Sequence, residues 1–308
     1  MNASIIIAAK NAEPFIHIAL ASALNQTMTD LEVIVINDGS SDATAEVVRR
    51  FQHSDSRVIL LDNPQSLGVS AARNRGLDIA EGDWIAVLDA DDAFALDRLA
   101  TMIEQAEERN LDLLADNMLF RELGTSAAGH VAYPNDWMTD TRHLTLADLL
   151  ERDRPGSEHP MFGYIKPLMR RRFLNDARLR YRDDVWCAED FLLYAEAILK
   201  GAAFGVTNDP LYIRYWRAGS LSADTPAVHG EIARVNRLVA AVARRSAPGT
   251  LPIIRRRQAE LDYVAAARAA KAGAFATAVR TALRVPLPVI IAKLVQAVRK
   301  KALPRAKG

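Results

Sequence analysis

Four short apolar runs, each followed by a helix-like stretch, fill the first 110 residues of this chain. The runs have the length and β-branched content of strands: Ser4–Ala8, Leu31–Ile36, Arg57–Leu61 and Trp84–Leu88. The helical patterns that follow them span Pro14–Asn25, Asp42–Phe51, Val69–Ala80 and Ala95–Arg109. Such alternation predicts an α/β fold with a mostly parallel sheet covered by helices. Right-handed crossovers then place the carboxyl ends of the strands at one edge, where such sheets bind ligands.

The chain is expected to have three parts. After a fifth strand at Leu111–Leu114, the first part ends near residue 120. Residues 121–225 form the second part. A hairpin and loop are expected across Asp116–Asp140, followed by two helices and two strands: Leu144–Arg152, Glu189–Lys200, Ala203–Val206 and Leu211–Tyr215. Residues 226–308 form a helical segment broken by prolines, with Ser246–Thr250 as the best boundary for a separate tail.

Charge is distributed unevenly along the chain. Residues 250–308 carry 13 Lys and Arg against two acids, a charge of +11, so the net charge of +1 leaves −10 for the rest. A basic tail on an acidic body predicts an anionic partner, although a solvated helix has the same composition. Val289–Ala302 is too short to span a bilayer. We expect it to lie at an anionic membrane surface or to pack on the body, and we expect no nucleic-acid partner.

The location of the protein is predicted from two weak signals. The opening residues lack the basic start and apolar run of a signal peptide. Cys187 is the single cysteine, which suits a reducing compartment. These features predict a cytoplasmic protein, peripheral at the inner face of the cell membrane if the basic segment binds there.

The strongest chemical signal is Leu88-Asp-Ala-Asp-Asp92, at the end of a predicted strand. In an extended chain Asp89 and Asp91 point to the same side. Three carboxylates in four positions repel one another unless a cation or hydrogen-bond donors balance them. Such hard oxygen ligands suit Mg²⁺ or Mn²⁺ bridging a diphosphate. The alternative is an Asp-rich turn that caps the next helix.

Two further motifs lie at the same predicted edge. Ile36-Asn-Asp-Gly-Ser-Ser-Asp42 ends the second strand, and Asp38 could accept a hydrogen bond from a base N–H. A plain strand-to-helix turn is the alternative there. Gly68–Gly76 carries Arg73 and Arg75, which cannot share one helix face. We expect Arg73 to point inward, toward the carboxylates or the nucleotide phosphates.

Taken together and in this order, these blocks resemble the nucleotide-binding half of family 2 glycosyltransferases. The resemblance covers Ser4–Ile7 with Asn11–Ile16, Ile36–Asp42, Gly68–Asn74 and Leu88–Asp92. It implies the GT-A fold, a nucleoside-diphosphate sugar as donor and transfer with inversion. It also implies nucleotide binding by Asn11, Asp38, Arg73 and Asp89, and a metal held by Asp91 with Asp89. The family often has Pro-x-Tyr-Asn after the first strand. In the family the Tyr of this segment packs on the nucleotide base. Here the stretch is Ala8-Ala-Lys-Asn11, which lacks that aromatic residue, and a UDP-sugar is the favoured donor.

The second part has fainter marks of the same family. Gly163–Leu174 followed by Ala188-Glu-Asp-Phe191 resembles the segment that leads to its catalytic Glu-Asp motif. The resemblance implies that Asp190 is the general base, with Glu189 as the alternative base. An ordinary acid at a helix start is the competing interpretation. Tyr212–Ser222 resembles a phosphate-binding loop, in which Arg217 and Ser220 would hold the donor phosphates.

The favoured interpretation is therefore sugar transfer to a hydroxyl of a glycan, most simply a lipid-linked one in exopolysaccharide or cell-surface polysaccharide synthesis. A sugar-phosphate nucleotidyltransferase would need a Gly-rich, basic loop after the first strand, and Ala8–Asn11 has no glycine. The third alternative is a family member that binds a nucleotide or a partner without catalysis.

Overall fold

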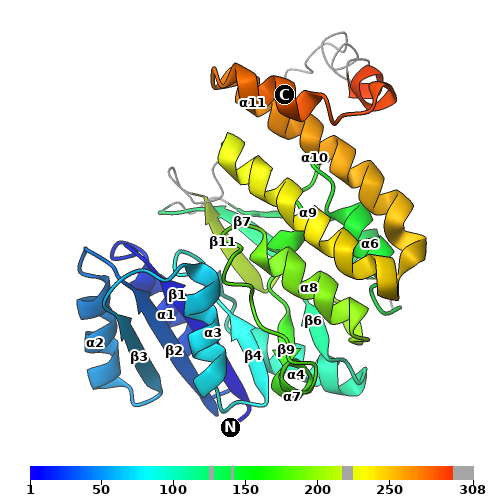
Figure 1. Ribbon diagram of the computed structural model, residues 1–308. Helices are drawn as coiled ribbons and strands as arrows, with labels where there is room; N and C mark the ends of the chain where they lie inside the picture. The colour runs from blue at the N-terminus through cyan, green and yellow to red at the C-terminus, as the bar shows by residue number, and fades with distance from the viewer. Residues whose placement is uncertain (125–127, 140–141, 217–224, 294–308) are drawn as a thin grey trace.

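The computed structural model places residues 1–124, 128–139, 142–216 and 225–293 (Figure 1). Its strands are β1 (Ala3–Ala9), β2 (Leu31–Asp38), β3 (Val58–Asn63), β4 (Trp84–Val87), β5 (Ala93–Phe94), β6 (Leu113–Ala115), β7 (Met118–Glu122), β8 (His130–Val131), β9 (Leu168–Arg170), β10 (Phe204–Val206) and β11 (Tyr212–Trp216). Its α-helices are α1 (Ile16–Leu24), α2 (Thr44–Ser54), α3 (Val69–Ile79), α4 (Arg98–Glu108), α5 (Asn135–Met138), α6 (Leu146–Arg152), α7 (Arg171–Asp176), α8 (Glu189–Leu199), α9 (Pro226–Ser246), α10 (Leu251–Lys271) and α11 (Phe275–Ala282).

A seven-stranded sheet in the order β10-β6-β9-β4-β1-β2-β3 forms the centre of the molecule. Every neighbouring pair in it is parallel except the two pairs made by β9. The inner strands β1, β2 and β4 are almost wholly buried, as their largely apolar sequences predict. The expectation of a mostly parallel α/β sheet with a helical C-terminal part is confirmed.

Strand β9 was not predicted from the sequence, and it matters for the site. It runs antiparallel between β4 and β6, with Leu168 opposite Ala86 and Arg170 opposite Trp84. Because β9 runs against β4, the residues just before β9 lie at the carboxyl end of β4. This reversal brings Lys166 next to the aspartates that follow β4.

A second sheet of four strands, in the order β5-β11-β7-β8, adjoins that edge. Its strand β11 pairs antiparallel with β5, which directly follows the aspartates, and parallel with β7. The predicted hairpin between residues 116 and 140 corresponds to β7 and β8. The small sheet therefore carries Tyr212 to the end of β4.

Helix α3 packs closely on the sheet through Gly76. A Cβ atom at this position would lie 2.7 Å from Cγ2 of Ile6 and 3.0 Å from Cδ1 of Ile36, in β1 and β2. We expect Gly76→Ala to lower the free energy of unfolding by about 1–3 kcal/mol, because the core must shift to admit the methyl group. Urea denaturation measures this loss.

Gly230 in α9 is the matched control, since a Cβ there would meet no atom within 4 Å. We expect Gly230→Ala to raise the free energy of unfolding by about 0.5–1 kcal/mol through helix propensity. Equal unfolding midpoints for Gly76→Ala and wild type would contradict the close contact between α3 and the sheet.

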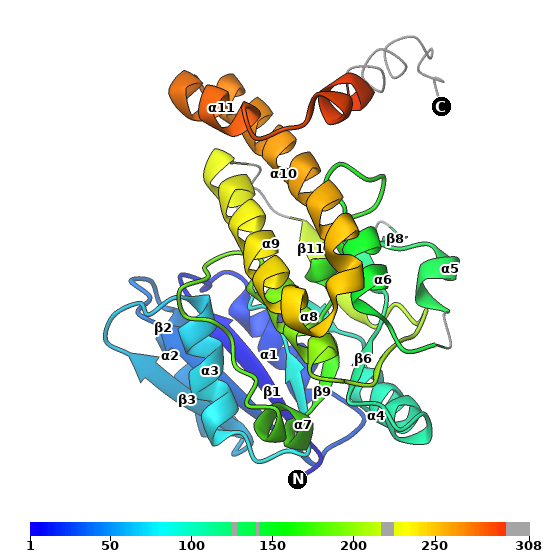
Figure 2. The same cartoon turned by 45° about the vertical axis from the view of Figure 1, so that its right-hand side comes forward.

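The C-terminal helices α9 and α10 form a hairpin on the body (Figures 1 and 2). Their turn is the 3₁₀ helix η2 (Pro248–Thr250), within the stretch expected to bound a separate tail. A buried ion pair joins Arg257 of α10 to Asp153, just after α6, and the same guanidinium donates to Asn236 of α9 at 2.7 Å. The hairpin is thus anchored by buried polar contacts as well as by apolar packing.

Candidate active site

A charged cluster lies at the carboxyl edge of the large sheet. Its members are Arg73 of α3, Asp89 after β4, Lys166 before β9, and Glu189 and Asp190 at the start of α8. These residues come from distant parts of the chain. The structure thus brings together Asp89, Arg73, Glu189 and Asp190, which the sequence analysis proposed from three separate motifs.

Arg73 is the hub of the cluster. Its guanidinium donates to Asp89 Oδ1 at 2.9 Å, Glu189 Oε1 at 2.6 Å and Asp190 Oδ1 at 3.0 Å, and the residue is 3% exposed. Burial alone would lower the pKa of Arg73, but the three carboxylates raise it well above its usual value. Arg75, two positions along α3, remains partly exposed. Arg73 is thus the inward-facing arginine, and its contact with a nucleotide stays a prediction.

Lys166 is a member of the cluster that the sequence analysis missed. Its Nζ lies 2.5 Å from Asp190 Oδ2 and 3.2 Å from Asp89 Oδ2. Burial would lower the pKa of this lysine, but the two aspartates outweigh that effect and raise it. Lys166 falls within Gly163–Leu174, which had been noted only for its family resemblance. The position of Lys166 depends on β9, and a strand of three residues is too short to be predicted from its hydrophobic pattern.

The two candidate bases differ in their surroundings. Asp190 is 6% exposed, and its two oxygens contact Arg73 and Lys166. The side chain of Glu189 is 11% exposed, and burial together with Asp190 raises its pKa. Ala188, directly before them, has a left-handed backbone (φ 61°), which is uncommon for alanine and typical of constrained functional turns.

The pKa values of Asp89 and Asp92 are shifted in opposite directions by their neighbours. Burial would raise the pKa of Asp89, but Lys166 and Arg73 hold it well below the usual range. Asp92 accepts from the Tyr212 hydroxyl at 2.9 Å and the Tyr215 amide at 3.1 Å, and burial beside Asp89 raises its pKa to about 8. Asp92 therefore joins the small sheet to the end of β4.

Asp91 is the aspartate that the sequence analysis proposes as the main metal ligand, and it is partly exposed. The oxygens of Asp89, its proposed companion, contact Arg73 and Lys166. Within the described ranges, no group of three or more His, Cys, Asp or Glu side chains is arranged to hold a metal ion. Mg²⁺ and Mn²⁺ with nucleotides usually take only one or two carboxylates and complete their shell with phosphate oxygens and water. One or two carboxylates, here Asp91 with Asp89, are enough for such an ion, and metal binding by them stays a prediction.

Asp38 and Asn11 brace loops at the same edge. Asp38 accepts four hydrogen bonds, from Asn63, Ser66, Leu67 and Gly68, and these lower its pKa although burial would raise it. A carboxylate has about four acceptor sites, so a base N–H would have to share or displace one of these donors. Asn11 accepts from the Ser41 amide at 2.8 Å. Nucleotide contacts by both residues stay predictions.

Two of the proposed phosphate ligands, Arg217 and Ser220, lie outside the described residues. The tryptophans beside the second-half motifs are described, and both are open to solvent. Trp186 is 51% exposed and Trp216 is 65% exposed, so neither is a core residue.

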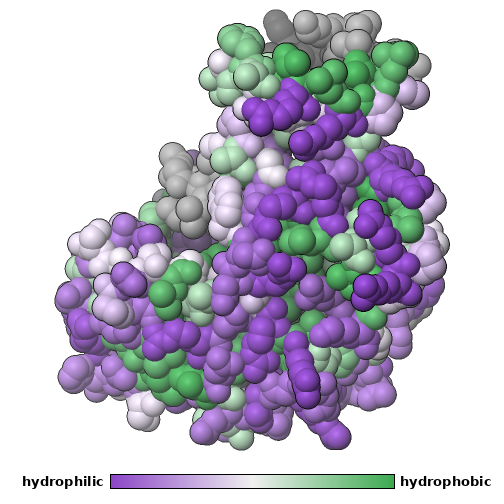
Figure 3. All heavy atoms as spheres, in the orientation of Figure 1, coloured by the Kyte–Doolittle hydropathy of each residue, from purple (hydrophilic) through white to green (hydrophobic). Residues whose placement is uncertain are grey.

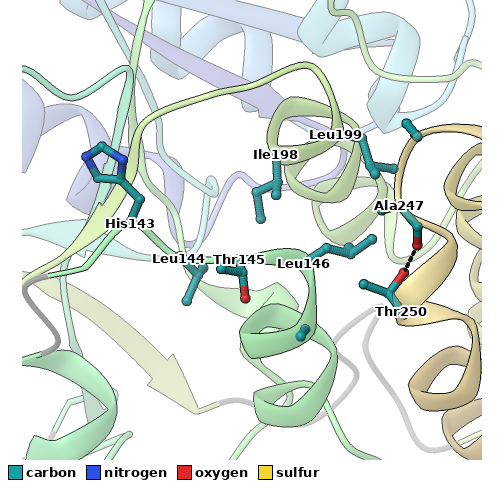
Figure 4. A pocket seen from close by; sticks show the side chains of 10 residues that line it. His143, Leu144, Thr145, Leu146, Ile198, Leu199, Ala247 and Thr250 are labelled. Carbon is teal, nitrogen blue, oxygen red and sulfur yellow. Dashed lines mark hydrogen bonds between the residues drawn. The ribbon is translucent and has the colours of Figure 1, made fainter.

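A hollow of about 340 Å³ lies away from the charged cluster (Figure 4). It is lined by the start of α6, by the α9–α10 turn and by Ile198 and Leu199 at the carboxyl end of α8. Glu189 and Asp190 begin the same helix, whose 11 residues span about 16 Å. The hollow is therefore separate from the cluster.

The sequence of the first part of the chain, which forms most of this sheet edge, matches a known protein family. Residues 4–173 match the profile of Glycosyl transferase family 2, so the chain belongs to that family. Among curated relatives, the succinoglycan biosynthesis proteins ExoO and ExoU of Rhizobium meliloti are 35% and 36% identical over 217 and 220 residues. These matches cover 70% and 71% of this chain but only 61% and 63% of the relatives. The chain thus spans about three fifths of their length.

Solved structures show the same fold at low identity. S. aureus TarS (residues 1–349) in complex with UDP-GlcNAc has a TM-score of 0.64 and 21% identity, covering 87% of this chain and 71% of that one. The mannosyltransferase PcManGT from Pyrobaculum calidifontis, in complex with GDP-Man and Mn²⁺, has a TM-score of 0.63 and 19% identity, covering 98% and 81%. The expected GT-A fold is confirmed.

Proposed function

We propose that this protein transfers a sugar, with inversion, from a nucleoside-diphosphate sugar to an acceptor hydroxyl. The observation that carries this proposal is the buried cluster in which Arg73 joins Asp89 to Glu189 and Asp190. In this cluster Asp89, proposed for the donor side, lies next to Glu189 and Asp190, proposed for proton removal. Family membership supports the same reaction class.

The division of labour follows from the contacts. Asp190, with Glu189 as the alternative, takes the proton from the acceptor hydroxyl as its oxygen attacks the anomeric carbon. Arg73 and Lys166 hold these carboxylates in place and keep the cluster from repelling itself. Asn11, Asp38, Arg73, Asp89, Arg217 and Ser220 form the proposed donor-binding set.

Mn²⁺ or Mg²⁺ completes the donor site in this proposal. Asp91, with Asp89 behind it, would hold the ion, which supplies positive charge to the leaving diphosphate. The complex of PcManGT contains Mn²⁺ together with GDP-Man, and this supports the proposal of a metal here. A UDP-sugar remains the favoured donor, although Lys10 stands where relatives often place an aromatic residue.

The acceptor is proposed to be a glycan in exopolysaccharide or cell-surface polysaccharide synthesis, carried on a lipid. The names of ExoO and ExoU, which concern succinoglycan biosynthesis, support the polysaccharide class. A protein that uses cytoplasmic nucleotide sugars and a lipid-linked acceptor would work at the inner face of the cell membrane, and we propose that location.

The test is nucleoside diphosphate release from a panel of nucleotide sugars, with Mn²⁺, with Mg²⁺ and with chelator. We expect slow hydrolysis of one donor, which chelator abolishes and Asp91→Ala lowers at least ~100-fold, because charge stabilisation of the leaving diphosphate is lost. Asp97→Ala is the matched control, since Asp97 is an exposed aspartate six positions along the chain.

Two outcomes would contradict parts of the proposal. If nucleoside diphosphate release is unchanged by chelator and by Asp91→Ala, the proposed metal site is wrong but the proposed transferase activity still stands. Nucleotide binding without release from any donor, tested with acceptor-bearing membrane extracts, would favour the non-catalytic alternative.

A further inference from the structure

The distal end of the C-terminal segment exposes an apolar ridge. Five large apolar residues recur at every fourth position and are 52–83% exposed: Phe275, Val279, Leu283, Leu287 and Ile291. Residues four apart lie on one side of a helix, so those of α11 share one face. Ala278 and Val285 are buried instead, at 8% each. Figure 3 shows hydrophobic surface gathered at this end of the molecule.

Only positive charge accompanies this ridge. No Asp or Glu follows Asp262 in the sequence, whereas ten Lys and Arg do. Of these, Arg280 and Arg284 lie within the ridge segment and are exposed, and Lys293 is partly exposed. An apolar ridge with cations and no acids is complementary to an anionic lipid surface, with acyl chains beneath and headgroups around it.

The geometry favours lying on a bilayer over crossing it. Among the residues placed by the structure, no single helix is long and apolar enough to span a membrane. The pair Phe275–Ala282 and Leu287–Lys293 passes the length and composition test together, but its axes are bent by 115°. Each helix is about 10–12 Å long at 1.5 Å per residue, well under the ~30 Å hydrocarbon core.

Helix α10 also holds the ridge away from the body. Helix α10 packs along α9, and its contact with the body includes the buried Arg257–Asp153 pair and the Arg154–Glu260 pair at 2.5 Å. In both ribbon views α11 lies at the end of the molecule opposite the chain start, from which β1 begins (Figures 1 and 2). The carboxyl edge of the sheet, with the charged cluster, therefore faces the half of the molecule that carries α11.

We propose that α11 and residues 283–293 dock this protein on an anionic lipid bilayer. The apolar ridge enters the headgroup boundary, and Arg280, Arg284 and Lys293 contact lipid phosphates. Docking in this orientation turns the charged cluster toward the membrane side of the molecule. Vesicle binding does not depend on the chemistry at that cluster, so docking and sugar transfer can each fail without the other.

The test is co-sedimentation of the full chain with phosphatidylglycerol-containing vesicles and with neutral phosphatidylcholine vesicles. We expect binding to the anionic vesicles at least about tenfold stronger, and weakened by salt. Val279→Glu with Leu283→Glu should lower binding at least about tenfold without unfolding the chain, because both side chains are exposed. Arg280→Ala with Arg284→Ala should remove most of the preference for anionic lipid.

Val242→Glu is the matched control, because Val242 is an apolar residue of α9 that is 40% exposed outside the ridge. It should bind vesicles like wild type. Equal binding by the ridge variant and wild type would overturn the proposal. A second pair of results would also overturn it: wild type does not bind vesicles, and light scattering shows a concentration-dependent dimer that the ridge variant does not form. The ridge would then be a contact between copies of the chain.

Discussion

Arg73→Met is expected to lower the free energy of unfolding by about 3–5 kcal/mol, because it leaves buried carboxylates without their cation. Sugar transfer should fall at least ~1,000-fold in the same variant, since the candidate base and Asp89 would no longer be held together. Arg73 contacts three carboxylates at 3.0 Å or less and has almost no exposed surface.

Urea denaturation and steady-state transfer measure the two effects separately. Arg73→Lys keeps the positive charge, but lysine lacks the planar guanidinium that contacts three carboxylates at once. We therefore expect losses of stability and activity that are smaller than those of Arg73→Met. Arg75→Met, on the same helix but partly exposed, should stay within about 0.5 kcal/mol of wild type. An Arg73→Met protein as stable as wild type would show that Lys166 and solvent can balance the cluster without the arginine.

The α/β half of the fold could be predicted because its signals are local. Strands β1, β2 and β4 are largely apolar, and the helices between them have helical periodicity, so the predicted bounds agree with the structure to within three residues. Strand β9 has only three residues, two of which are Leu168 and Met169. Its place between β4 and β6 depends on pairing with distant segments, which periodicity cannot reveal.

The same limit explains Lys166. A lysine in a short loop is usually solvated, and here it is buried only because β9 reverses direction beside β4. The carboxylates of the cluster were recognisable from their motifs. Their pairing was not, because Asp89 and Asp190 are about a hundred residues apart and meet through Arg73.

Asp38 shows a different limit of sequence reasoning. The carboxylate that would suit a base N–H also suits the amides of Leu67 and Gly68, and the structure uses it for those. Loop bracing and ligand binding need the same acceptor chemistry, so the residue type alone does not separate them. The bracing does position the start of α3, and with it Arg73.

Asp190→Asn is expected to lower the turnover number by about 10²–10⁴-fold, because an amide cannot accept the proton of the acceptor hydroxyl. Nucleotide affinity should change little, since the lost step follows donor binding. Measuring nucleoside diphosphate binding beside turnover separates the two. Glu196→Gln, two turns along α8 and partly buried, is the matched control and should retain activity.

Glu189→Gln decides between the two candidate bases. Both oxygens of Asp190 contact cations, whereas Glu189 is somewhat more open, and burial together with Asp190 raises its pKa. If Asp190 is the base, Glu189→Gln should cost about tenfold or less, as a change in the support of Arg73. A large loss in Glu189→Gln with activity kept in Asp190→Asn would transfer the role to Glu189. Full activity in both variants would place the base outside α8 and overturn the proposed mechanism.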